Sequence, residues 1–174
     1  MNIFMTDSDP KQAAYDHCVV HRNKMIIEVS QMLCTAHRLL DGEQAGDQRN
    51  LYKATHINHP CAVFVRSSAD AYNWTYEHLR ALHTYYYHHR AMRHASLRLL
   101  PALSNYPNNI SHEPSFKPVV AAPSEFKVLA DRSDVVTAYR AYMNWKLREW
   151  IHRDRPMKVE WPYGKPYWLD NDIN

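Results

Sequence analysis

Residues 9–41, DPKQAAYDHCVVHRNKMIIEVSQMLCTAHRLLD, decide the fold of this chain. Asp9 followed by Pro10 is typical of a helix start, because an aspartate side chain caps free N–H groups and proline fits the first helical turn. The helical pattern continues to Leu40, either unbroken or broken near residues 18–20, and Asp41 with Gly42 ends it. A helix of this length is expected to organise an all-α protein.

One face of this helix carries polar side chains at alternating steps of four and three residues, and positions so spaced share a helix face. This first row comprises His17, His21, Lys24, Glu28, Gln31, Thr35 and Arg38. Burial of unpartnered charge costs on the order of several kcal/mol, so the row either faces water or lines a polar cleft. Two histidines, a lone glutamate and an amide are unusual for a solvated face, which favours the cleft.

A second polar row has nearly the same spacing, in a helix expected to begin near Pro60 and to run from about residue 61 to residue 100. It comprises Arg66, Asp70, Asn73, Glu77, Arg80, Thr84 and His88. Solvent exposure is the expectation for Glu77, Arg80 and His88. The row follows the polar segment YKATHINHP, residues 52–60. We predict that both rows and this segment converge on one cleft.

Composition indicates an ordinary globular protein, with 45% hydrophobic and 22% charged residues and a net charge of +3. The 174 residues fit a single domain, and the charge permits a polyanionic partner without requiring one. Three glycines, none in a phosphate-binding loop, exclude P-loop and Rossmann chemistry. No apolar stretch approaches the length of a membrane span, and Cys18, Cys34 and Cys61 are expected to be free thiols. A cytoplasmic protein is expected.

The remaining segments predict a compact helical bundle with irregular additions. Residues 1–5 are expected to form a strand or an anchored arm, and residues 43–50 a polar loop. Five prolines between residues 101 and 123 predict a long loop that wraps the bundle. Helices capped by Ser124 or Ser133 should end near Trp150, before an irregular aromatic tail over residues 155–169.

Several polar side chains suit an anionic ligand or proton transfer. Arg38, Arg66 and Lys24 offer charges that match phosphate, and solvation is their alternative role. Glu28 is placed to accept a proton or to hold an ammonium group, and a structural ion pair with Lys24 is the alternative. Aromatic rings at Tyr72 and Trp74 suit base stacking, although rings at helical spacing usually belong to a core.

The histidines permit a metal interpretation, since His17, His21, His56 and His59 are ligands of the type that zinc accepts. The sequence has no His-Glu-x-x-His pattern and no paired cysteines. We therefore expect no metal and no nucleotide cofactor, and favour a role of histidine in phosphate binding and proton transfer.

Several short motifs together resemble a known protein family. They are Met-Asn-Ile-Phe at the start, Asp9-Pro10, His17-Cys18, His21, Lys24-Met25, Glu28, residues 35–38 (TAHR), residues 52–60 (YKATHINHP), Arg66-x-Ser68 and Asn73-Trp74. This pattern is similar to bacteriophage amino acid:DNA transferases of thymidine hypermodification, over roughly residues 1–150. A more distant similarity is to phage pyrimidine-dimer DNA glycosylases, which are compact all-α proteins.

The resemblance implies that the amine of an amino acid, with glycine expected, displaces phosphate from 5-phosphomethyl-deoxyuridine in double-stranded DNA. Such chemistry needs a flipped-out base, cations for the leaving phosphate and a base for the amine. The candidate catalytic residues are Glu28, His21, Lys24, His37 and Arg38. The candidates for binding substrate, phosphate or DNA are His17, Gln31, Lys53, His56, Asn58, His59, Arg66, Asn73, Trp74 and His94.

Two alternatives stay open. A glycosylase with lyase activity would use an α-amine exposed by removal of the initiator methionine, but Met1 precedes Asn2, which is a poor second residue for that removal. A DNA-binding phage protein without catalytic activity is the other alternative. The expected partners are duplex DNA with a modified thymine and a free amino acid, and no membrane.

Overall fold

The first helices begin where the sequence signals place them. A computed structural model describes residues 1–173. Helix α1 spans Pro10–Tyr15, and the Asp9 carboxylate accepts the Lys11 backbone N–H at 2.9 Å. A break at residues 16–18 precedes α2, Val19–Asp41, which ends at Gly42 with a φ of 94° that a side chain would disfavour. The pattern is thus broken, as one alternative predicted, but the break lies at residues 16–18 and not at residues 18–20, so His17 lies outside α2.

Two predicted segments differ from the structure. Residues 43–50 were expected to be a loop, yet Glu43–Gln48 form α3. The single helix expected to begin at Pro60 and to run to residue 100 is instead α4 (Pro60–Val65), α5 (Ala69–Arg90), the 3-10 helix η1 (Ala95–Leu99) and α6 (Leu100–Leu103). Ser68 interrupts it, because its hydroxyl accepts the Ala71 N–H at 3.2 Å and so caps a new helix.

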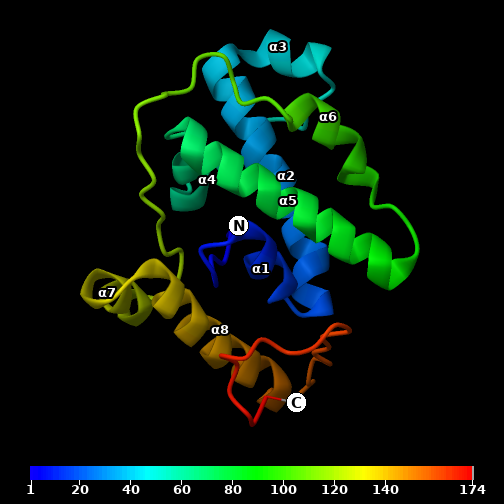
Figure 1. Cartoon of the computed structure of the whole chain (residues 1–174), viewed down its shortest axis with the longest axis vertical. Helices are drawn as coiled ribbons and strands as arrows, with labels where there is room; N and C mark the ends of the chain where they lie inside the picture. The colour runs from blue at the N-terminus through cyan, green and yellow to red at the C-terminus, as the bar shows by residue number, and fades with distance from the viewer. Residues whose placement is uncertain (174) are drawn as a thin grey trace.

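The carboxyl-terminal third follows the prediction more closely. Residues 104–123 contain no helix and run along the outside of the helices (Figure 1). Helix α7 spans Ser124–Arg132, and α8 spans Val135–His152. The cap of α8 is Asp134, whose carboxylate accepts the Thr137 N–H at 2.9 Å, and not the predicted Ser133. The longer acceptor arm of an aspartate one residue nearer the helix takes that role.

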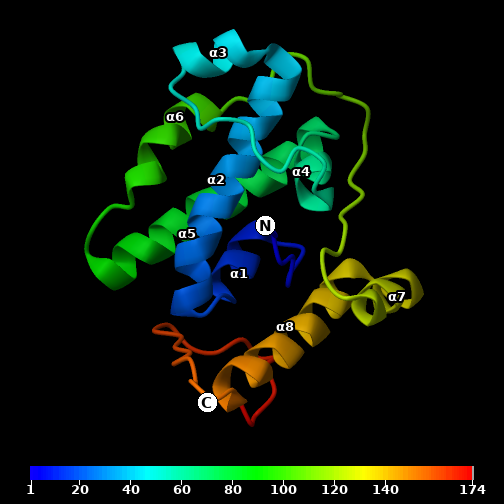
Figure 2. The same ribbon diagram turned by 180° about the vertical axis from the view of Figure 1, so that it is seen from behind.

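Helices α1 and α2 both pack against α5, while α3 and α4 pack on α2, and α7 packs on α8. Both ribbon views place the N-terminal arm between α5 and α8 (Figure 2). Buried hydrophobic side chains from Ile3 to Ile173 belong to one core cluster. Residues 1–173 contain no strand, so the prediction of an all-α fold is confirmed.

The two ends of the chain complete the core without regular structure. The Asn2 carboxamide oxygen accepts the N–H groups of Ile3 and Phe4 and the Tyr139 hydroxyl, so residues 1–5 form an anchored arm. The indoles of Trp161 and Trp168 donate to Asp16, at its carbonyl and its carboxylate. The tail thus packs through its aromatic rings, as predicted.

The three cysteines are free and buried. Burial raises the pKa of Cys34 and of Cys61 to about 11. None of the helices in residues 1–173 combines the length and the apolar character needed to cross a bilayer.

Candidate functional site

Glu28 is the centre of the largest group of predicted residues that the structure brings together. Its carboxylate lies 3.4 Å from the Lys24 ammonium and 3.6 Å from the α-amine of Met1. The Lys24 side chain is 69% exposed and that of Glu28 only 13%. Glu28 therefore holds two primary ammonium groups at the boundary between protein and solvent.

Charged groups from two other segments lie near Glu28. Burial lowers the pKa of His59. The positive charges of the chain's α-amine and of His56 lower this pKa further, whereas the negative charge of Glu28 raises it. On α8, burial lowers the pKa of Lys146, and the charge of Lys24 adds to the effect. We call the group of Lys24, Glu28, His56, His59 and Lys146 the Glu28 site.

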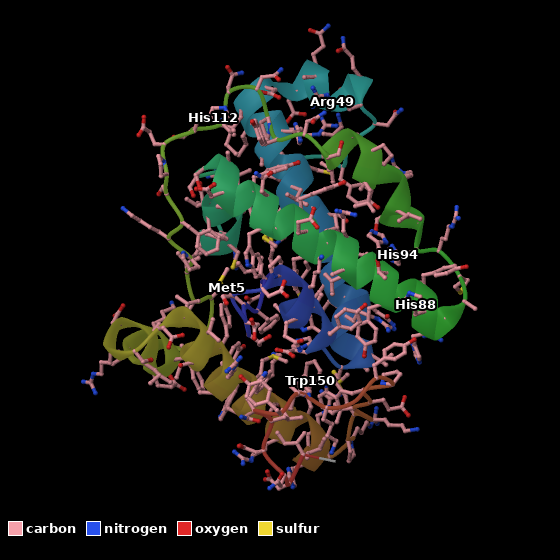
Figure 3. All side chains as sticks on the ribbon, in the orientation of Figure 1. Met5, Arg49, His88, His94, His112 and Trp150 are labelled. Carbon is pink, nitrogen blue, oxygen red and sulfur yellow. The ribbon has the colours of Figure 1, made fainter. Side chains whose placement is uncertain are left out.

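Aromatic rings lie beside the Glu28 site. Trp145 and Tyr142 of α8 are stacked, with centroids 5.9 Å apart and planes at 21°. The Lys146 ammonium lies 5.5 Å from the Tyr142 ring centroid and 5.2 Å from that of Trp150, which Figure 3 shows on α8. Trp145 is 46% exposed, so one large ring, stacked on the Tyr142 ring that Lys146 contacts, is open to solvent.

Phe4 connects the arm to these rings in an unusual backbone conformation. Its φ of 41° is uncommon for a bulky residue. The ring lies 5.9 Å from that of Tyr142 and 4.5 Å from that of His21. Residues in such conformations persist only where their surroundings hold them, and they cluster at functional sites.

His21 and His17 do not reach the solvent-facing part of the site. Both are buried, His21 against Phe4 and Trp150, and His17 beside His78. Burial, with the charges of Lys146 and Lys24, lowers the pKa of His21 to about 3. A base with so low a pKa is weak near neutral pH, which disfavours the predicted role of His21 as the alternative base. His21 is buried because the arm and α8 cover this face of α2.

Arg38 has a structural role in place of the predicted contact with phosphate. Its guanidinium donates to the backbone carbonyls of Leu51, Tyr52 and Glu43 and to the carboxylates of Glu43 and Asp47. Lys53 pairs with the same Asp47 carboxylate at 2.8 Å, and with Arg38 it lines a cavity of about 450 Å³. These contacts fix α3 and the following segment on α2, so Arg38 is not free to bind a ligand.

Three further predicted side chains are buried by packing. His37 contacts the Tyr72 hydroxyl at 2.8 Å and Arg49 at 3.1 Å, and burial lowers its pKa to about 4. Trp74 stacks on His78 and donates its indole N–H to the Ser8 carbonyl at 2.7 Å. Base stacking by Trp74 or Tyr72 is therefore incompatible with the structure, because both rings belong to the core.

The second row faces solvent over most of its length. Arg80 and His88 are exposed and Glu77 is partly exposed, so the expected solvent exposure of these three side chains is confirmed. Asn73 is also exposed. Arg66 is partly buried, and one of its guanidinium nitrogens is buried without a hydrogen-bond partner among residues 1–173. In residues 1–173 no hydrogen bond or ion pair joins the two rows, so the predicted shared cleft is not formed by their contacts.

The other candidates lie in separate places. Gln31 is partly buried one turn beyond Glu28, and Asn58 is exposed next to His59. Thr35 exchanges hydrogen bonds with the backbone of Thr55, which ties the 51–59 segment to α2. His94 lies near the end of α5, away from Trp150 (Figure 3), and lines a cavity with members of the second row.

The metal interpretation lacks the required cluster. Among residues 1–173, no three His, Cys, Asp or Glu side chains are arranged to hold a metal ion. His17 and His21 are buried, whereas His56 is exposed and His59 partly exposed, so the four histidines do not form one group.

Sequence reasoning missed Lys146 and Trp145. The signal was present on α8, where Tyr142, Lys146 and Trp150 recur at intervals of four residues and therefore share one face. The covering of α2 by this face depends on tertiary packing, which the spacing does not reveal.

Comparisons of the chain with protein-family models, with curated proteins and with solved structures gave no match.

Proposed function

We propose that the protein transfers an amino acid, glycine in the simplest case, to 5-phosphomethyl-deoxyuridine in duplex DNA with release of phosphate. The sequence resemblance suggests this reaction. The observation that carries the proposal is Glu28, a partly buried carboxylate that already holds primary ammonium groups at 3.4 and 3.6 Å.

The residues of the Glu28 site match the steps of this reaction. An amino acid enters as an ammonium ion and must lose a proton before its nitrogen can attack. Glu28 accepts that proton, the new C–N bond forms at the 5-methylene carbon, and the C–O bond to phosphate breaks. The phosphate leaves with the electron pair, next to the cations Lys24 and Lys146.

The exposed aromatic ring supplies a place for the base. A thymine derivative modified inside a duplex must leave the base stack, and an enzyme holds it by stacking and by polar contacts. Trp145 is exposed and stacks on Tyr142, the ring that Lys146 contacts, so it takes the stacking role that the sequence assigned to Trp74. His56 and His59 add contacts for DNA phosphate from the 51–59 segment.

The direct test is incubation of the protein with glycine and a duplex that contains 5-phosphomethyl-deoxyuridine. Mass measurement of the digested nucleosides should show the glycine adduct, with one inorganic phosphate released for each adduct. Glu28→Gln should lose product by a factor of ~10² or more, because the proton acceptor is gone, yet still bind the duplex. Glu125→Gln, an exposed carboxylate on α7, is the matched control and should keep full activity.

Three outcomes would contradict the proposal. Full activity of Glu28→Gln removes the role of the carboxylate. A protein–DNA adduct trapped by borohydride, without a glycine product, would support the glycosylase and lyase alternative. Loss of activity on addition of a chelator, with recovery on addition of zinc, would show that the reaction needs a metal ion, contrary to the proposed mechanism.

A further inference from the structure

A cavity of about 500 Å³ lies between α1, α5 and the segment over residues 93–100, and it contains no residue of the Glu28 site. Its volume is within the range of sites for small organic ligands. The walls combine cationic side chains with aliphatic and aromatic surface. This composition is typical of a site for an anion with an apolar body.

The lining contains more cationic than anionic side chains. Arg80 is paired with Glu77, its only carboxylate neighbour in the lining, at 2.8 and 3.0 Å. Lys11 and Arg93 line the same cavity and have no ion-pair partner within residues 1–173. Two uncompensated cations therefore face one concave surface from α1 and from the segment after α5.

His94 adds a neutral hydrogen-bond donor. Its Nδ1 accepts the Ser96 backbone N–H at 3.2 Å, and Ser96 Oγ lies 2.8 Å from the same nitrogen. Burial lowers the pKa of His94, which favours the neutral ring. A neutral imidazole that accepts at Nδ1 carries its proton on Nε2. This Nε2–H has no partner among the described residues.

Another part of the lining is apolar. Ala81, Leu97 and Leu100 contribute aliphatic surface, and the half-exposed ring of Tyr87 contributes a flat face. Aromatic faces favour stacked or edge contacts with another planar group. A ligand with a planar body is therefore favoured over a compact ion.

We propose that this cavity binds a phosphate monoester with a planar body, of the size of a mononucleotide. A phosphate monoester has a charge of about −2 at neutral pH, which equals the uncompensated charge of Lys11 and Arg93. Its oxygens accept from both cations and from His94, while the planar body lies on Tyr87 and Leu97. This is a second ligand site, independent of the proposed amino-acid transfer.

The test is calorimetric titration with thymidine 5′-monophosphate, thymidine and inorganic phosphate. The monophosphate should bind saturably, and each of the two fragments at least about tenfold more weakly, because each lacks one half of the contacts. Arg93→Gln and Lys11→Gln should each weaken binding about tenfold. Arg132→Gln, an exposed arginine on α7, should leave the dissociation constant unchanged.

Amide chemical shifts show where the ligand binds, and on addition of the monophosphate they should change at Ala81 and Leu97. Shifts confined to the Glu28 site, no saturation by 5′-monophosphate, or equal weakening by Arg132→Gln would each overturn the proposal. Preferred binding of a 5′-phosphorylated octanucleotide would overturn the assignment to a free small molecule. Because no DNA transfer is assayed, this result is separate from the test of the proposed function.

Discussion

The rings of His17 and His78 lie in the core with centroids 5.7 Å apart, and within the described part of the chain neither nitrogen of His17 nor Nε2 of His78 has a hydrogen-bond partner. His78 Nδ1 is bonded to the Pro10 carbonyl, 2.9 Å away. Burial lowers the pKa of His78 to about 4 and that of His17 well below its ordinary value. Both rings are therefore neutral in the folded protein near neutral pH.

These histidines predict that stability falls in mild acid. Between pH 6.5 and about 4 the unfolded chain binds protons at these side chains and the folded protein does not. The free energy of unfolding therefore decreases as the pH falls through this range. At pH 5.5, one unit below the unfolded pKa of 6.5, each histidine lowers the free energy of unfolding by about 1.4 kcal/mol relative to neutral or higher pH. Urea denaturation at pH 7.5 and 5.5 measures the difference. His17→Leu should make it smaller, and an unchanged difference would show that His17 is protonated in the folded state.

Arg38→Ala should destabilise the fold by about 1–3 kcal/mol, because the backbone carbonyls of Leu51 and Tyr52 lose their donor. Gly46→Ala tests the same contact from α3, since a Cβ there would lie 2.6 Å from Arg38 Cγ and should cost about 1–3 kcal/mol. Urea denaturation measures both, with Arg132→Ala as the exposed control. Wild-type stability of Arg38→Ala would return Arg38 to the list of candidate ligand-binding residues.

Binding to unmodified duplex should weaken with salt, because Lys24, Lys146 and the nearby histidines contact phosphate and release counterions. Replacing Lys24 and Lys146 together by Gln should reduce the slope of log affinity against log salt by about two. Fluorescence anisotropy over a series of salt concentrations measures it. A slope that is the same in the double variant would place the DNA contacts elsewhere on the molecule.

Trp145→Ala should weaken binding of the modified duplex by about 1–3 kcal/mol, the usual range for loss of a stacked base. Binding of a duplex without the modified base should change less, because an unflipped base does not reach the ring. Tyr163→Ala, another exposed aromatic, serves as the control. Equal losses on the two duplexes would mean that Trp145 contacts the DNA backbone and not the base.

Local chemistry predicted the helix boundaries well where a cap or a proline sets them. Asp9 with Pro10, and Pro60, each stand at or next to the start of a helix, whereas Ser124 is the first residue of α7 and not its predicted cap, because Pro123 occupies the cap position. Helix α3 was missed because its sequence, EQAGDQ, has no apolar face, and its contacts with the buried Arg38 come from tertiary structure. No periodicity in residues 43–48 contains that information.

The candidate site was predictable only where its contacts lie within one helix. Lys24 and Glu28 are one turn apart on α2, so their pairing follows from spacing alone. The polar row did not reveal that Phe4 and Trp150 cover His21, because those residues are 17 positions before and 129 positions after it in the chain. Polarity indicates where a side chain is unusual, and packing decides whether it reaches solvent.

The three buried cysteines report local opening of the fold through their rates of reaction with a thiol reagent. Burial raises the pKa of all three thiols, to about 11 for Cys34 and Cys61, so they are protonated at neutral pH, and a buried thiol reacts only when its surroundings open. Cys18 precedes α2, Cys34 lies in the second half of α2, and Cys61 is the second residue of α4, beside Tyr139. The labelling rates of the three sulfurs would therefore show which part of the molecule opens first, without any engineered probe.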